Sequence, residues 1–79
     1  MNWFINSAGW MATAELPSGN HIEIIKIREG SWRWSVNRSV NDEHWYWHGG
    51  RYKTLENAKK GVIKYLINTI SEDLEVLNG

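Results

Sequence analysis

The residues of this chain that could carry metal chemistry are three histidines: His21, His44 and His48. His44 and His48 are four positions apart in a stretch that alternates like a β-strand, so they share a face but stand roughly 13 Å apart along it. That separation is too large for one metal ion, and the chain has no cysteine to add a ligand. We therefore predict no metal and no cofactor, and interpret the histidines as surface or hydrogen-bonding residues.

A nucleophilic active site would need a serine, a histidine and a carboxylate brought together, with donors that stabilise an oxyanion. The chain contains these residue types, but they fall on predicted turns and strands without a nucleophile elbow or a glycine-rich oxyanion motif. We therefore predict that the protein has no catalytic residues and is not an enzyme.

A phosphate-binding loop is a further possibility at Gly49-Gly50-Arg51, because these residues precede a predicted helix and a helix N-terminus attracts anions. The Gly-Lys-Ser/Thr sequence of the nucleotide-binding P-loop is absent, however. We interpret the two glycines as a tight turn with positive φ that ends the sheet.

Two aromatic stretches, residues 32–40 and 44–48, alternate between apolar and polar side chains. If their tryptophans face a core, the opposite face is open, basic and aromatic. Such a face suits nucleic acid, whose phosphates and bases it would bind, and equally a protein partner, because Trp, Tyr and Arg dominate interface hot spots. An ordinary solvated face is the third alternative. The candidate partner-binding residues are Arg33, Tyr46, His48, Arg51 and Lys53, with Ser35, Asn37 and His44 on the same predicted face.

The charge is unevenly distributed, although the formal net charge is zero. All nine Lys and Arg residues lie between Lys26 and Lys64, where only four acids occur, so this segment has a net charge of +5. The residues after Lys64 include three acids and no base. The asymmetry favours an anionic partner for the middle of the chain, and a solvated surface with an acidic end is the alternative.

The length of 79 residues predicts one domain, residues 1–79, with a small core. Six Trp, three Tyr and one Phe compensate for that size, since each aromatic side chain can bury roughly 150–250 Å². No apolar run reaches the roughly 20 residues of a membrane span, and residues 1–9 do not resemble a secretion signal. With no cysteine, these features predict a protein of the cytoplasm, in the host cytosol.

The periodicity predicts an α+β fold, a four-stranded antiparallel β-meander with one C-terminal helix packed on one face. Residues 2–6 would add a fifth strand or form an arm. The alternation of residues 21–28 slips, which indicates either a bulge near Ile24–Ile25 or cover on both faces. The predicted strands are Trp10–Leu16, His21–Arg28, Trp32–Val40 and His44–His48, with a turn at Pro17–Asn20.

The helix is predicted over Leu55–Ile70, with Thr54 as its N-cap. Its apolar arc is wider than one sheet face requires. The apolar helix residues that the sheet does not cover would be covered by an N-terminal arm through Trp3 and Ile5, or by a homodimer through the helix. The residues that need this cover are Ile63, Ile67, Leu74 and Leu77. The predicted core comprises Trp10, Trp32, Trp34, Val36, Trp45, Trp47, Ala58, Val62, Leu66 and Ile70.

The stretch Gly30-Ser-Trp-Arg-Trp-Ser-Val36, followed by Tyr52-x-Thr54-x-Glu56-x-Ala58, resembles several small sheet-plus-helix modules. Over residues 22–66 its layout is similar to AP2-type DNA-binding domains and to integrase arm-binding domains. In size and element order the chain also resembles small phage-encoded anti-CRISPR proteins. The resemblance to anti-CRISPR proteins implies a phage or mobile-element inhibitor that binds a host defence complex.

These observations lead to two functional expectations. The first is a non-catalytic binding protein that inhibits a larger host macromolecular complex. The second is a nucleic-acid-binding module that uses the basic, aromatic sheet face. The neutral start and acidic end of the chain weigh against the second, because DNA-binding sheets usually carry a basic flank.

Overall fold

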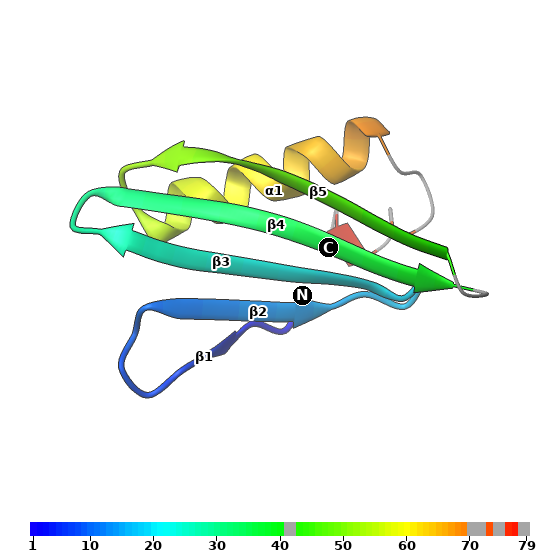
Figure 1. Cartoon of the computed structure of the whole chain (residues 1–79), viewed down its shortest axis with the longest axis horizontal. Helices are drawn as coiled ribbons and strands as arrows, with labels where there is room; N and C mark the ends of the chain where they lie inside the picture. The colour runs from blue at the N-terminus through cyan, green and yellow to red at the C-terminus, as the bar shows by residue number, and fades with distance from the viewer. Residues whose placement is uncertain (41–42, 70–72, 74–75, 78–79) are drawn as a thin grey trace.

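The computed structural model describes the backbone of residues 1–40, 43–69, 73, 76 and 77, and the side chains of the same residues except 39, 40 and 43–45. Five antiparallel strands in sequence order form one open sheet, and one helix packs across it (Figure 1). The predicted α+β meander is thus confirmed, with five strands. The elements are β1 (Phe4–Ile5), β2 (Met11–Glu15), β3 (Asn20–Arg28), β4 (Ser31–Val40), β5 (Glu43–Tyr52) and α1 (Leu55–Thr69).

The covered face of the sheet, which we define as the face that carries Ala12, Ile24 and Trp34, meets the helix. Strand alternation delivers one apolar residue to this face at every second position. Helix α1 packs on this face with Ala58, Val62 and Leu66, which repeat every four residues and have no exposed surface. The buried apolar residues of the sheet are Ala12, Ala14, Leu16, Ile22, Ile24, Trp32, Trp34 and Val36.

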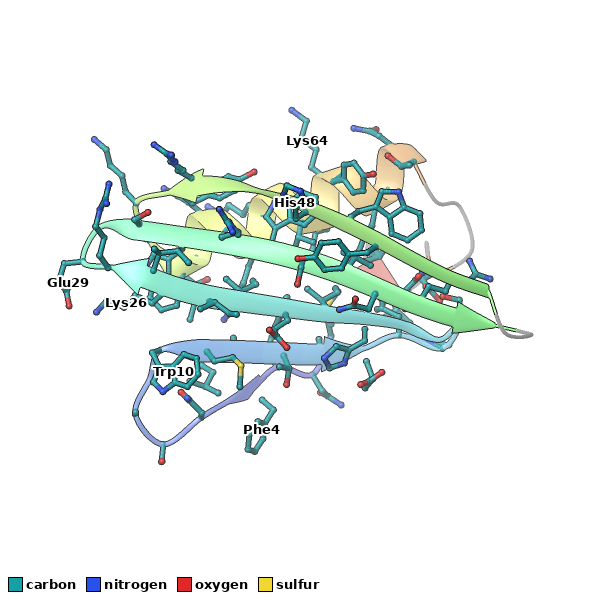
Figure 2. The ribbon with its side chains drawn as sticks, in the orientation of Figure 1. Phe4, Trp10, Lys26, Glu29, His48 and Lys64 are labelled. Carbon is teal, nitrogen blue, oxygen red and sulfur yellow. The ribbon has the colours of Figure 1, made fainter. Side chains whose placement is uncertain are left out.

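The predicted core is confirmed for most of its members, with one error. Trp47 is only partly buried. Trp10 is 45% exposed, because it precedes the first residue of β2 and lies at the end of the sheet, beyond the cover of the helix (Figure 2). The side chain of Trp45 and residue Ile70 lie outside the described residues.

The N-cap prediction is confirmed at Thr54, whose hydroxyl accepts a hydrogen bond from the backbone N–H of Asn57 at 3.1 Å. The one acidic residue of this first turn, Glu56, pairs with Lys59 at 3.1 Å. The helix is described to Thr69, and the predicted last residue, Ile70, is outside the described range.

The chain termini complete the cover of the core. Trp3 packs against the core with the ammonium of Lys59 5.4 Å from its ring, whereas Ile5 is 47% exposed. Leu77 is buried, and Ile63 and Ile67 are partly buried within one chain. Leu74 is outside the described residues. The homodimer stays a prediction, although part of the surface that motivated it is covered by the chain itself.

A buried carboxylate holds the C-terminal segment at the β2–β3 turn. Asp73 is 4% exposed and accepts hydrogen bonds from the backbone N–H of Ser18 at 3.0 Å and the side-chain amide of Asn20 at 3.3 Å. The Ser18 hydroxyl donates to it as well. This contact joins positions more than fifty residues apart, and it places Leu77 over the core.

Two register shifts correct the sequence interpretation, and both lie at the β3–β4 hairpin end of the sheet. The shift in β3 falls between Lys26 and Arg28, not at Ile24–Ile25, so Ile27 is the extra residue and is exposed. The shift between β4 and β5 makes Arg51 the extra residue between Gly50 and Tyr52.

The predicted turn at Gly49-Gly50 is wrong, because both glycines lie inside β5. A Cβ on Gly49 would lie 2.5 Å from Cζ2 of Trp34, so this glycine makes room for the indole. Gly50 has φ +156° and lies against the backbone of Arg33, its partner across the ladder. These contacts explain two adjacent glycines within a strand.

Candidate binding surface

The open face of the sheet, opposite the helix, carries side chains from all five strands. We define it by the three ladder rows that the register brings together. The first row is Glu15, His21, Asn37 and Tyr46. The second is Phe4, Thr13, Glu23, Ser35 and His48, and the third is Met11, Ile25, Arg33 and Gly50.

Tyr46 and His48 form an aromatic pair on β5. Their ring centroids are 5.7 Å apart with the planes tilted by 40°. Tyr46 is 61% exposed and His48 is also exposed, and Figure 2 shows His48 along β5 on the outer side of the sheet. Two of the predicted site residues are therefore neighbours on one strand, with rings available to a partner.

Ser35 departs from the predicted open face in its accessibility. It lies on that face by register, but it is 8% exposed. Its ladder neighbours Glu23 and His48 carry much longer side chains on the same face, beside the small hydroxymethyl group. Asn37 is exposed as expected, and the side chain of His44 is outside the described residues.

Carboxylates also lie on the open face, which sequence reasoning did not anticipate. Nδ1 of His21 contacts the Glu15 carboxylate, and Nε2 lies 3.9 Å from the carboxylate of Glu23. The imidazole thus bridges two acids on neighbouring positions of the ladder. The open face is therefore mixed in charge, acidic around His21 and basic at Arg33. The contact with Glu15 could be found only through strand register, since Glu15 and His21 are on different strands, whereas Glu23 shares a face with His21 by alternation along β3.

Two of the three remaining predicted residues lie together at the β3–β4 hairpin end. Arg33 and Arg51 line one hollow together with Arg28, the last residue of β3. Lys53 is exposed just after β5 and does not line that hollow. The structure thus divides the predicted set into an aromatic pair on β5, an arginine group at the sheet end and a separate lysine.

Among the described residues, no group of three His, Cys, Asp or Glu side chains is arranged to hold a metal ion. In the same part of the chain, no helix has the length and apolar character required to cross a membrane.

No protein-family model matches this chain, and neither a curated protein nor a solved structure does. The open face must therefore be interpreted from its own chemistry.

Proposed function

We propose that this protein is a non-catalytic binding protein that acts by occupying a surface of a larger host macromolecular complex, as an inhibitor of the kind that phages and mobile elements encode. The observation that carries this proposal is the contrast between the two sheet faces. Helix α1 covers one face, whereas the other presents the exposed ring of Tyr46 beside His48. A single layer with one uncovered face is suited to docking against a partner.

The mixed charge of the open face favours a protein partner. A nucleic acid presents a uniformly negative backbone, and the carboxylates of Glu15 and Glu23 would repel it. A protein surface can place both cations and anions opposite these groups and opposite Arg33. Electrostatic complementarity of this type provides specificity as well as attraction.

The exposed aromatic residues provide the expected hot spots. Tyr46 is 61% exposed and Phe4, at the opposite edge of the same face, is 70% exposed. Interface hot spots are enriched in large aromatic residues, which bury much area at little cost in side-chain entropy. The inhibitory part of the proposal rests on the resemblance of the chain to small phage-encoded inhibitors, which is an analogy of size and element order.

A second candidate function, nucleic-acid binding, is favoured by one observation, the concentration of arginines at the β3–β4 hairpin end. In this case phosphate contacts would come from the sheet end rather than from the centre of the open face. Binding would weaken steeply with salt, because each neutralised phosphate releases condensed counterions.

Affinity capture from host lysate, with and without nuclease treatment, tests the proposal. The captured protein is then purified and titrated against the wild type and two double variants. One is Tyr46→Ala with His48→Ala on the open face. The matched control is Asn57→Ala with Lys60→Ala, which alters exposed residues of α1.

We expect a nuclease-resistant protein partner whose affinity falls at least about tenfold in the open-face variant and stays unchanged in the helix control. Thermal melts of all variants verify that the fold is retained. Capture that disappears with nuclease, together with salt-dependent shifts of DNA or RNA, would replace the proposal with the second candidate. Equal loss of affinity in both double variants would remove the open face as the binding surface.

A further inference from the structure

Three arginines from three different strands converge on one hollow at the end of the sheet. Arg28 ends β3, Arg33 lies near the start of β4, and Arg51 lies near the end of β5. The hollow has a volume of about 90 Å³ and is open to solvent on one side. The rest of its lining is Ile27, Ser31 and Trp32. This arrangement differs from a row of surface cations, because arginines from three strands line a single concavity.

The two register shifts of the sheet account for this convergence. In a regular ladder, residues from neighbouring strands alternate between faces in step, so three arginines at unrelated positions would not gather at one place. The extra residues Ile27 and Arg51 interrupt the alternation on both sides of β4. Arg28 therefore pairs with Ser31, and Arg51 stands between the paired residues Gly50 and Tyr52. Gly50 allows the second shift, because a Cβ there would lie 3.0 Å from Cα of Arg33.

The positive charge of the hollow is not neutralised within the described part of the chain. No carboxylate lines the hollow, and no ion pair joins its arginines to an acid among the described residues. The nearest acid along the chain, Glu29 in the hairpin turn, pairs with Lys26 (Figure 2). Like charges held together repel one another, so an arrangement of this kind is stabilised by a bound anion.

We propose that this arginine hollow binds the dianionic phosphate of a phosphate monoester. Each guanidinium presents a planar fork of N–H donors that matches two oxygens of an oxyanion. A planar carboxylate has two oxygens, whereas a terminal phosphate has three and carries up to two negative charges. Three arginines and the Ser31 hydroxyl therefore suit a phosphate better than a carboxylate. Ile27 and Trp32 provide an apolar border for the group that bears the phosphate. This site shares Arg33 with the open face, but it does not include Tyr46 or His48, on which the proposed function rests.

Titration of the full ¹⁵N-labelled chain by NMR tests the site at constant ionic strength. The probes are inorganic phosphate, phenyl phosphate, adenosine 5′-monophosphate and a phosphotyrosine peptide, with dimethyl phosphate as a diester and sodium acetate as a carboxylate. We expect saturable shifts of the amides of Ser31, Trp32, Arg33 and Arg51 with the monoesters, and weaker binding of the diester and of acetate. The ranking of the monoesters identifies which source of the phosphate the hollow prefers.

Three variants distinguish phosphate binding by the paired N–H donors of a guanidinium from attraction by positive charge alone. Arg51→Ala should weaken phenyl phosphate binding about tenfold or more, as expected for loss of a charged hydrogen-bonding partner. Arg51→Lys keeps the charge but loses the fork, and should also weaken binding several-fold. Lys53→Ala removes the same charge two residues away, outside the hollow, and should change affinity less than twofold.

Equal weakening by Arg51→Ala and Lys53→Ala would overturn the proposal, because binding would then reflect net charge alone. The absence of saturable shifts with every monoester would overturn it too, as would tighter binding of the diester. The open-face variant Tyr46→Ala with His48→Ala should bind phenyl phosphate normally, so failure of this site and failure of the proposed function are distinguishable.

Discussion

Strand β4 presents two very different surfaces from alternate residues. On the covered face, Trp34 is 4% exposed and Val36 has no exposed surface, whereas Arg33 and Asn37 on the open face are exposed. Apolar burial is the main favourable term in folding, so most of the stability of the sheet comes from the covered face. The open face is consequently available for recognition, because changing its side chains removes little buried apolar area.

The covered face also has tighter steric requirements. The Trp34 indole donates a hydrogen bond to the hydroxyl of Tyr52 at 3.3 Å, and its ring centroid lies 4.9 Å from that of Tyr65. Gly49 makes room for Trp34, and Gly61 makes room for the Tyr52 phenol. On the open face, the described contact of the Tyr46 ring is with the ring of His48, which is itself exposed. This difference predicts that substitutions will separate into those that affect stability and those that affect binding.

The largest effect is expected from Trp34→Ala, which should lower the free energy of unfolding by about 3–5 kcal/mol, because it leaves a large cavity in the core. Chemical denaturation monitored by circular dichroism measures it. Trp10→Ala is the matched control, since this tryptophan is 45% exposed, and it should cost about 0.5 kcal/mol. Similar losses in the two variants would contradict the assignment of faces.

Asp73→Ala should lower the free energy of unfolding by about 1–3 kcal/mol, because it leaves the buried donors of Ser18 and Asn20 without their acceptor. Asp73→Asn keeps an acceptor oxygen and should cost less. Hydrogen exchange provides the second measurement, with loss of protection at the Leu77 amide, which donates to the Asp73 carbonyl at 2.9 Å. Unchanged stability in Asp73→Ala would show that the hydrogen bonds of Asp73 to Ser18 and Asn20 do not stabilise the packing of the C-terminal residues on the core.

Gly61→Ala should destabilise the protein by about 1 kcal/mol. Alanine favours a helix over glycine by about 1 kcal/mol, but the added methyl would overlap the Tyr52 phenol, and overpacking typically costs about 1–3 kcal/mol. Thermal unfolding in two backgrounds tests this reason. In Tyr52→Ala chains the same substitution should become stabilising, and a persistent destabilisation there would assign the effect to another contact.

The smallest stability change is expected from Tyr46→Ala, within about 0.5 kcal/mol, because this side chain is 61% exposed. The same substitution should weaken partner binding, as the proposed function requires. Measuring unfolding and binding on one preparation makes the comparison direct. A loss of several kcal/mol in stability would mean that the open face contributes to the core and is not an independent recognition surface.

Much of the fold was predictable because its signals are local. Alternation over residues 32–40 indicated a strand with one apolar face, and the four-residue repeat of Ala58, Val62 and Leu66 indicated an amphipathic helix. Thr54 could be assigned as the N-cap because capping involves only the next three residues. Trp10 was misplaced because alternation gives the face of a residue but not the point at which the cover of the helix stops.

The candidate surfaces were only partly predictable because they depend on register. Tyr46 and His48 are two positions apart on one strand, so their shared face follows from the period of two. The contact of His21 with Glu15 required the pairing of β2 with β3, whereas the shared face of His21 and Glu23 follows from the period of two along β3. The burial of Ser35 required its neighbours on both sides. These relations arise between strands, and composition does not encode them locally.

The sequence by itself determined the order of the elements, the apolar stripe of the helix and the shared face of Tyr46 and His48, since each follows from short-range periodicity. Only the tertiary structure decided where the ladder shifts, at Ile27 and Arg51, and hence that Arg28, Arg33 and Arg51 border one hollow. The reason is that the position of a register shift depends on how two paired strands fit together along their whole length. At Gly49 and Gly50 this balance includes the volume of the Trp34 indole and the backbone of Arg33, which no local pattern specifies.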